Sequence, residues 1–418
     1  MTINNEHNKL NVPNKREQNQ TCLDSAEREE LRPKGNVPNL RFPEFQGEWE
    51  KCKLGDIINF STTRVNSSEL NKDNYVSTEN MLQDYQGIVK AKSVPEDVNV
   101  VSFSCGDILI SNIRPYLKKV WKATFNGGCS SDVFVLKAND NIESDYLHYV
   151  IANDKFINFV MSGAKGVKMP RGDKKQMETY SLSLPQIQEQ HKIVRLLSLL
   201  DERISTQNKI IEDLKKLKSA IIDYAISSID ADFIKFSSLY EIAGEGGTPT
   251  TSNASFYDNG KIPFIKIDDL KKKYLTKNKD FITELGLQKS SAWLVPTRSI
   301  LFSNGATIGE ITITTYPVCT KQGILGIVPK QNINVEFLYY FMSSSYFKKA
   351  VSRIVTEGTM KTAYLKDINN TLCPIPTKEK QQEIAKMPSA LNSKIDLEQS
   401  ILKLFCSQKQ HLLRQMFI

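Results

Sequence analysis

The chain has 418 residues, with 55 Lys and Arg against 47 Asp and Glu, and a formal net charge of +8 at pH 7. This length allows about two to four domains, and the small excess of positive charge favours an anionic partner only weakly. Seven cysteines without a Cys-x-x-Cys pair and four scattered histidines argue against a disulfide framework and a zinc site. No apolar run approaches the ~18 residues that span a bilayer. We therefore expect a cytoplasmic protein that binds neither a metal nor a membrane.

The first half of the chain predicts a polar segment followed by a mixed domain. Residues 1–39 are rich in Asn, Gln, Glu and Lys, and we expect this N-terminal segment to be disordered. Residues 40–185 contain short β-like runs bounded by Gly, Asn and Asp, and a helical pattern from about Ser144 to Phe159. This alternation predicts an α/β (α+β) domain over residues 40–185.

Residues 186–230 predict a long helix with a coiled-coil seam. Apolar residues recur there in alternating steps of four and three, and Gln207 and Lys218 occupy the polar exceptions. At about 1.5 Å per residue, forty residues would extend roughly 60 Å, too far for a small domain to cover alone. The seam residues are Ile193, Leu197, Leu200, Ile204, Ile211, Leu214 and Ile221.

The second half repeats the first at a constant offset of 191 residues, as when Pro185 aligns with Pro376 and Gln190 with Gln381. We predict a second domain over residues 231–376 and a second long helix over 377–418, packed antiparallel on the first. Its Pro388 predicts either a kink or a helix that begins just before this residue. A duplicated domain suits a target with two half-sites. The second seam consists of Ile384, Leu391, Ile395, Leu402 and Phe405.

A glycine-rich basic loop follows the first domain's helix. Residues 165–175 hold five cations against one acid, Asp173. Lys and Arg neutralise phosphates and Arg also grips guanine, so we interpret this loop as a DNA contact, and a merely solvated loop is the alternative. The corresponding residues of the second half differ in chemistry and predict a different half-site. The candidates are Lys165, Lys168, Arg171 and Lys174 in the first half and Lys361, Thr362 and Tyr364 in the second.

Two turns that follow buried strands give further candidates. Asn112 and Arg114 lie in the first, and Asn304 and Thr307 lie in the second. Asn can read adenine, but Asn is equally an ordinary turn residue. The run Lys271-Lys272-Lys273 indicates a solvated face or a nonspecific phosphate contact.

The sequence shows no catalytic signature. It lacks an Asn/Asp-Pro-Pro-aromatic motif and a G-x-x-x-x-G-K-[S/T] phosphate loop. We therefore predict no catalytic residues. A nuclease or methyltransferase, a coiled-coil adaptor and a stand-alone DNA-binding protein remain the competing hypotheses.

The arrangement resembles the specificity subunit of type I restriction–modification systems. The resemblance is carried by the ten residues from Leu40 to Trp49, by the Pro-x-x-x-Glu-Gln-x-x-Ile entry at Pro185, and by Leu200-Asp201. The second half departs from it, with Lys380 for the Glu and Asn392 for the Asp.

This resemblance implies a protein that binds double-stranded DNA through two target-recognition domains, each reading one half of a bipartite site. It implies that the long helices set the gap between the half-sites. It also implies two modification (methyltransferase) subunits as partners, joined by restriction subunits in the full complex. The chain itself would be non-catalytic and hold no cofactor, because S-adenosylmethionine is expected in the modification subunit.

Overall fold

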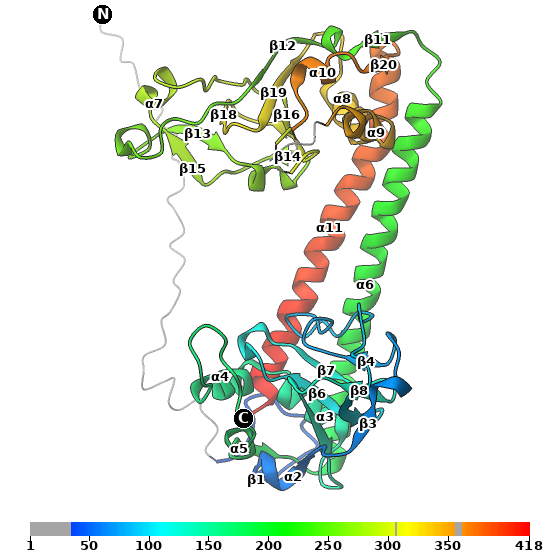
Figure 1. Ribbon diagram of the computed structural model, residues 1–418, viewed down its shortest axis with the longest axis vertical. Coiled ribbons are helices and arrows are strands. Elements are labelled where there is room, and N and C mark those ends of the chain that lie inside the picture. Colours follow the sequence, from blue (N-terminus) through cyan, green and yellow to red (C-terminus); the bar gives the residue numbers. More distant parts are fainter. Residues whose placement is uncertain (1–34, 306, 356–361) are drawn as a thin grey trace, which may run out of the picture. The chain divides into compact units, whose positions relative to one another are not determined.

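The computed structural model describes residues 35–305, 307–355 and 362–418, which form two compact units (Figure 1). Unit 1 comprises Met1–Glu202 with Cys406–Ile418, and unit 2 comprises Arg203–Phe405. Residues 1–34 of the polar segment lie outside the described residues. Asn36, inside the range expected to be disordered, is buried, and its carbonyl accepts the backbone N–H of Trp49 at 2.8 Å.

Unit 1 is a mixed α/β domain. Its described strands form the antiparallel pair β1–β10 and two four-stranded sheets, ordered β2-β9-β6-β7 and β3-β5-β8-β4. The strands are β1 (Glu50–Lys53), β2 (Ile58–Phe60), β3 (Arg64–Asn66), β4 (Tyr75–Val76), β5 (Asn99–Phe103), β6 (Ile108–Ser111), β7 (Val120–Lys122), β8 (Gly127–Cys129), β9 (Val133–Ala138) and β10 (Ser181–Leu184). The short helices are α2 (Leu54–Ile57), α3 (Ser144–Ile151), α4 (Asp154–Ser162) and α5 (Lys174–Glu178).

Unit 2 is also a mixed α/β domain, with sheets of five and three strands. Its described strands form the pair β11–β20 and two sheets, ordered β12-β19-β16-β17-β14 and β15-β13-β18. The strands are β11 (Phe233–Lys235), β12 (Tyr240–Glu245), β13 (Ile262–Ile265), β14 (Tyr274–Leu275), β15 (Asp280–Ile282), β16 (Ile300–Ser303), β17 (Ile311–Thr314), β18 (Cys319–Thr320), β19 (Ile324–Pro329) and β20 (Leu372–Pro374). The short helices are α7 (Glu284–Gln288), α8 (Val335–Ser343), α9 (Ser345–Ile354) and α10 (Leu365–Ile368).

The predicted internal repeat is confirmed by the pairing of the strands. β6 lies between β9 and β7, and β16 lies between β19 and β17, all antiparallel. Even the unusual parallel pair recurs, because β4 pairs with β8 as β13 pairs with β18. The prediction of two similar α/β domains is therefore correct.

A buried glutamine ties each domain to the long helix that follows it. Gln190 and Gln381 are each 1% exposed. The side-chain oxygen of each accepts a backbone N–H at 2.8 Å, from Glu143 and Asn334 respectively. The side-chain nitrogen of Gln190 donates to the Pro185 carbonyl at 2.9 Å and to that of Asn141 at 3.3 Å, and Gln381 repeats both bonds. Glu143 and Asn334 are the residues that cap α3 and α8, so this side chain fixes the core helix against the long one.

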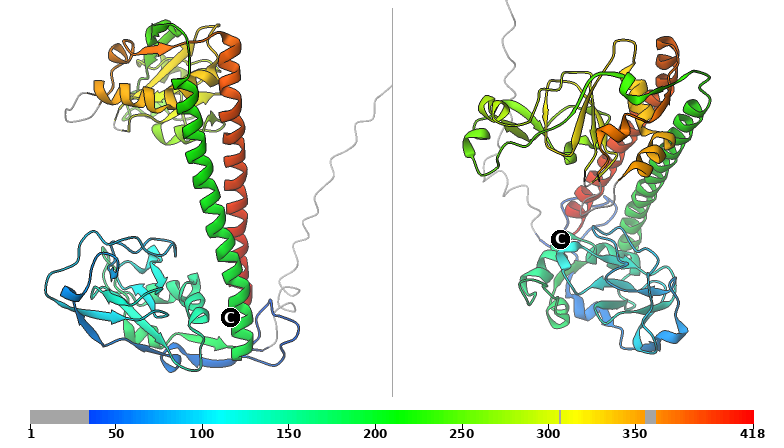
Figure 2. Two further views of the ribbon diagram at one scale, coloured as in Figure 1. Left: turned by 90° about the vertical axis from the view of Figure 1, so that its right-hand side faces the viewer. Right: turned by 45° about the horizontal axis from the view of Figure 1, so that its top comes forward.

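The long helices α6 (Ile187–Ser227) and α11 (Lys378–Met416) run side by side in both views of Figure 2. Within unit 1, Lys409 contacts Asp201, and within unit 2, Gln207 contacts Glu398 and Lys218 contacts Asn392. As the residue number rises along α6, it falls along α11. The predicted antiparallel packing of the two helices is therefore confirmed.

Pro388 lies inside α11, which begins at Lys378. The alternative that the helix begins just before the proline is therefore wrong. Pro388 is buried, and the hydroxyl of the next residue, Ser389, donates to Glu336 at 2.7 Å. Packing on the second domain thus holds the helix at the point where proline removes a backbone hydrogen bond.

Unit 1 has an additional connection that explains why the two copies differ. Glu189 is 1% exposed and accepts two bonds of 2.8 Å from the Arg41 guanidinium and one of 3.1 Å from the Trp49 indole. The hydrogen bond that Arg41 donates to Glu189 is the main cause that raises the pKa of Arg41. The corresponding Lys380 is exposed and forms an ion pair on its own helix, with Glu383 at 2.8 Å.

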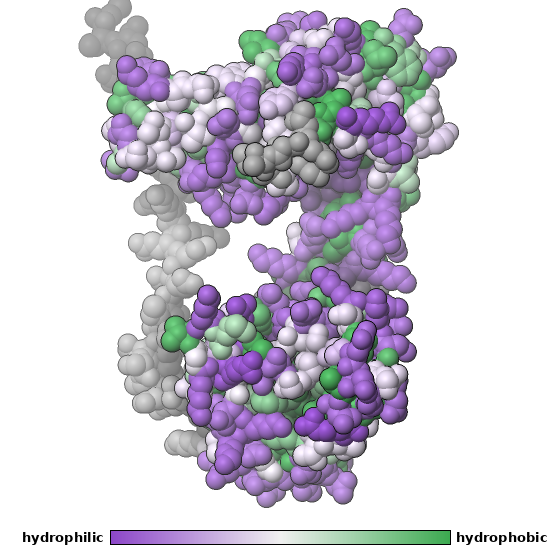
Figure 3. All heavy atoms as spheres, in the orientation of Figure 1, coloured by the Kyte–Doolittle hydropathy of each residue, from purple (hydrophilic) through white to green (hydrophobic). Residues whose placement is uncertain are grey.

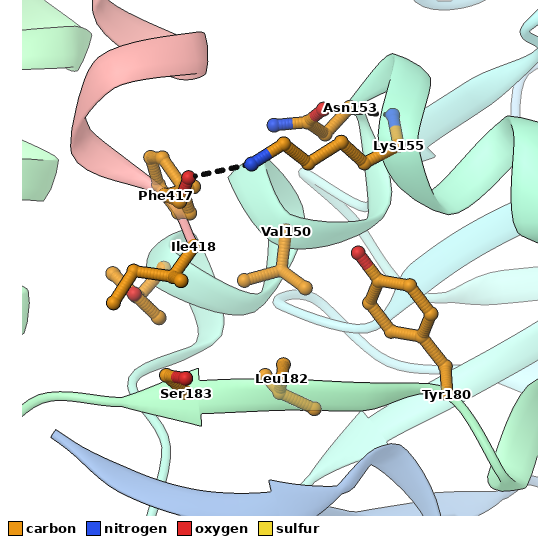
Figure 4. Close-up of a pocket in the computed structure, with 9 residues that line it drawn as sticks. Val150, Asn153, Lys155, Tyr180, Leu182, Ser183, Phe417 and Ile418 are labelled. Atoms are coloured by element: carbon orange, nitrogen blue, oxygen red, sulfur yellow. Dashed lines mark hydrogen bonds between the residues drawn. The ribbon is translucent and has the colours of Figure 1, made fainter. Parts of the chain in front are cut away.

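The C-terminus is also fixed within unit 1 (Figure 4). The Phe417 ring stacks on Tyr146 at 5.2 Å, and its carbonyl accepts the Lys155 ammonium at 2.9 Å. The cavity left between them, about 10 Å³, has room for about one water molecule. This cavity is a packing contact and not a ligand site.

We expect Gln190→Ala and Gln381→Ala each to lower the free energy of unfolding by about 2 kcal/mol, because each leaves a buried N–H and a buried carbonyl without a partner. Chemical denaturation of the full chain measures the loss. Gln188 and Gln382 are exposed on the same helices, so Gln188→Ala and Gln382→Ala serve as matched controls. Equal stability of the buried and exposed variants would contradict the role given to the buried pair.

Candidate nucleic-acid interface

The basic loop, residues 165–175, is held in place by backbone hydrogen bonds. Lys165 and Arg171 exchange two, of 3.1 and 2.9 Å, which close the loop into a hairpin. The N–H of Arg114 donates to the Pro170 carbonyl at 2.7 Å, and the N–H of Gly172 donates to the Asn112 carbonyl at 2.8 Å. In Figure 1 this segment links α4 to α5 at one side of unit 1. The loop is thus attached to the turn that follows β6.

The cations of this loop remain accessible although some are paired. The Lys165 side chain is 85% exposed and lies 3.5 Å from Asp173, while the Arg171 side chain is 54% exposed and lies 3.2 Å from Asp132. Lys168 is exposed. The Lys174 ammonium lies 5.0 Å from the ring centres of both Phe60 and Phe134. These positions allow contact with an anionic partner.

The carboxylate of this loop, Asp173, caps the helix that follows it. Asp173 caps α5 by accepting the backbone N–H of Gln176 at 3.2 Å. This hydrogen bond, assisted by Lys165, lowers the pKa of Asp173. The single acid of the loop is therefore used to start a helix.

The two candidate asparagines are buried, Asn112 at 8% exposure and Asn304 at 1%. Their backbone carbonyls perform equivalent tasks, since Asn112 accepts the N–H of Gly172 and Asn304 accepts that of Ala363 at 2.9 Å. The Asn304 side chain also donates to the Ala363 carbonyl at 3.2 Å. Of the two interpretations that the sequence left open, this geometry favours the structural one, because neither amide faces solvent to read a base.

The remaining candidates are dispersed. Arg114 adopts a left-handed conformation with φ of +50° and is partly buried. Thr307 is exposed, and so is Tyr364, whose ring lies 5.5 Å from the Lys366 ammonium. Thr362 is partly buried, and Lys361 lies outside the described residues. The structure brings together the candidates of the first half around the basic loop.

Beside this loop lie two hollows that the sequence did not reveal. They have volumes of about 370 and 430 Å³, and Tyr75 lines both of them. Lys90 and Lys92 line one, and Arg64 and Lys174 line the other. The lining comes from segments distant in sequence, so no local motif could have indicated it. The hollow lined by Arg64 and Lys174 has no acidic side chain among its described lining residues and extends the basic surface next to the loop, whereas Glu79 and Asp132 balance the two lysines of the other.

The expectation that Lys271-Lys272-Lys273 forms a solvated face is wrong for Lys273, which is 5% exposed. Its ammonium contacts Glu336 at 2.5 Å and the Ser389 hydroxyl at 2.9 Å. Tyr274 and Tyr340 complete the network through Glu336 and Ser389. Burial opposes ionisation of Glu336, but the hydrogen bonds from Lys273, Tyr274 and Ser389 outweigh it and lower its pKa. Lys273 thus connects the second domain to α11.

The predicted seam residues are buried to different depths, and Ile193 and Leu197 also belong to the core of unit 1. Among them, Ile193, Leu197, Leu200, Ile211 and Ile395 are buried, and the others are half-buried: Ile204, Leu214, Ile221, Ile384, Leu391, Leu402 and Phe405. Other apolar side chains of these helices face outward, as Leu217 does at 48% exposure and Leu404 at 69%. Figure 3 shows hydrophobic residues among the hydrophilic ones on this surface. The helices thus offer apolar side chains beyond those of the seam.

No group of three or more His, Cys, Asp and Glu side chains in the described ranges could hold a metal ion. None of the helices described is long and apolar enough to cross a membrane.

Comparison with known proteins links this architecture to one family. The model of the type I restriction modification DNA specificity domain matches residues 46–216 and again residues 229–404. A putative type I restriction enzyme MjaX specificity subunit of Methanocaldococcus jannaschii is 25% identical over 399 residues, which cover 87% of this chain and 91% of that protein. The HindI specificity subunit of Haemophilus influenzae is 22% identical over 399 residues, covering 75% and 86%. The crystal structure of a type I restriction-modification S subunit from M. genitalium shares the fold, with a TM-score of 0.55 and 17% identity over 91% of this chain and 99% of that one.

We expect Lys273→Met to destabilise the protein by about 2 kcal/mol, because it leaves the Glu336 carboxylate without its buried cation. Lys272 is exposed, so Lys272→Met is the matched control. A lowered carboxylate pKa contributes stability above its ordinary value of 4.5, and this contribution is lost as the pH falls through the lower folded value. Urea unfolding at several pH values should therefore show the two variants converging in acid. A difference that persists at low pH would contradict the ion-pair assignment.

Proposed function

The chain belongs to the family of type I restriction modification DNA specificity subunits, and we propose that each of its two domains reads one half of a bipartite DNA site. The observation that carries this proposal is the repeat itself. The two units share the strand order of one sheet, β2-β9-β6-β7 and β12-β19-β16-β17, and a buried glutamine joint, while the loops that follow their core helices differ in sequence. A common frame with different loops suits two half-sites of different sequence.

We propose that this chain recognises the DNA sequence and that its partner subunits catalyse the reactions. Two modification subunits would bind S-adenosylmethionine and methylate adenines, and restriction subunits would join them in the full complex. The outward-facing apolar side chains of α6 and α11, such as Leu217 and Leu404, give partner proteins a surface to bury. The basic loop and the hollows beside it are the first domain's candidate surface for DNA.

The proposed role is tested by mapping adenine methylation with long-read sequencing in cells that express this chain with its cognate modification subunit. We expect a split, asymmetric motif that appears only when both proteins are present. Cells with either protein alone are the controls. If no new methylation appears although the two subunits purify together, the proposal is refuted.

We propose that the paired helices set the gap between the half-sites. A heptad inserted after Gln207 in α6 and another immediately before Glu398 in α11 keeps the seam in phase. Seven residues add about 10 Å of helix, which corresponds to about three base pairs at ~3.4 Å each. We expect the mapped motif to keep both half-sites and to gain about three base pairs between them.

The matched control for this insertion adds seven residues at position 230, between the end of α6 and β11. It lengthens the chain without lengthening the helices, so its gap should stay unchanged. An unchanged gap in the double-heptad variant would show that the helices are not the ruler.

A further inference from the structure

The tip of the basic loop carries two exposed apolar side chains. Val167 is 103% exposed and Met169 is 47% exposed. Among the exposed large hydrophobic residues of the described chain, Val167 has the highest exposed fraction. Burial of an exposed apolar side chain by a partner removes apolar surface from water and lowers the free energy of the system. Two of them at one tip therefore point to a partner with an apolar interior.

The loop holds this tip in a defined place. Gly166 turns the chain with φ of +96°, a conformation that glycine adopts readily. The exchange of backbone bonds between Lys165 and Arg171 closes the base of the tip, and Pro170 is buried. Exposure of Val167 is thus built into a hairpin whose two ends are fixed.

The charges around the tip identify the class of partner. Lys165 and Arg171 stand at the base of the hairpin and Lys168 lies between the two apolar residues. Their cations remain exposed, as the 85% of Lys165 and the 54% of Arg171 show. A stacked DNA duplex matches this arrangement, because it has phosphates at its rim and apolar base faces inside.

We propose that Val167 and Met169 form an apolar wedge that enters between neighbouring base pairs of the first half-site, while Lys165, Lys168 and Arg171 hold the flanking phosphates. This inference rests on the proposed function. The wedge replaces base stacking with contacts to two side chains and kinks the duplex locally. Unstacking at this step lowers the cost of drawing a nearby base out of the helix for modification. In the sequence, Gly358 stands where Val167 stands, so the proposal concerns the first domain.

The test uses the complex of this chain with its modification subunit and a duplex that carries the mapped motif. Single purines of the first half-site are replaced in turn by 2-aminopurine, whose fluorescence rises when it is unstacked. We expect a rise at one step with the wild type. The double variant Val167→Ser/Met169→Gln should abolish the rise and weaken binding by at least about tenfold, because the burial of a single apolar side chain already contributes about that much affinity.

Two comparisons separate the wedge from its surroundings. The double variant keeps every cation, so the slope of log affinity against log salt should stay unchanged, whereas Lys165→Ala/Lys168→Ala/Arg171→Ala should flatten it. Ile242 is 58% exposed on β12, outside the basic loop and outside both hollows, and Ile242→Ser is the matched control that should preserve both affinity and fluorescence.

Three results would overturn the wedge. The wedge is overturned if the wild type binds and methylates the duplex but no position brightens, or if the double variant behaves as the wild type does. It is also overturned if the double variant fails to bind its modification subunit in the absence of DNA, because the tip then serves a protein contact. If the wild-type complex binds no DNA at all, the proposed function fails together with it.

Discussion

The structure depends on a buried glutamine that occurs at the equivalent position of both repeats. Gln190 and Gln381 each bridge the capped start of a core helix and the turn that enters a long helix, through bonds that agree between the copies. A buried amide is costly unless all of its hydrogen bonds are made, so this position admits little variation in angle. Each domain is therefore joined to its helix in the same way, whatever its exposed loops contain.

The polar contacts between the long helices also recur at equivalent positions of the two repeats. Position 207 contacts its own repeat equivalent, 398, and the contact of Asp201 with Lys409 is matched by that of Lys218 with Asn392. Apolar residues at the other seam positions would allow several alignments, but these polar pairs fit only one. Hydrogen bonds from Lys394 and Gln207 also lower the pKa of Glu398. The helices thus have a fixed register, which a ruler between two half-sites would require.

Around this common frame the two halves have diverged in what they expose. The first basic loop presents cations and an apolar tip on a closed hairpin. In the second half, Lys273, which lies outside the segment corresponding to that loop, is buried in a network with Glu336 and Ser389. Divergence at the surface with constancy beneath is the pattern expected when two domains keep one fold and read different partners.

The sequence by itself determined the repeat, the mixed α/β class of both domains and the pairing of the long helices. Hydrophobic periodicity is a local property of the chain, and a constant offset appears when the sequence is aligned with itself. Only the tertiary structure decided which polar residues are buried. Lys273 and Asn304 carry turn and surface signals in the sequence, yet both lie in the interior. Pro388 continues a helix that a local rule would interrupt there, and Tyr75 lines hollows assembled from distant segments. Burial depends on which distant segments of the chain pack together, and a local sequence pattern contains no information on that packing.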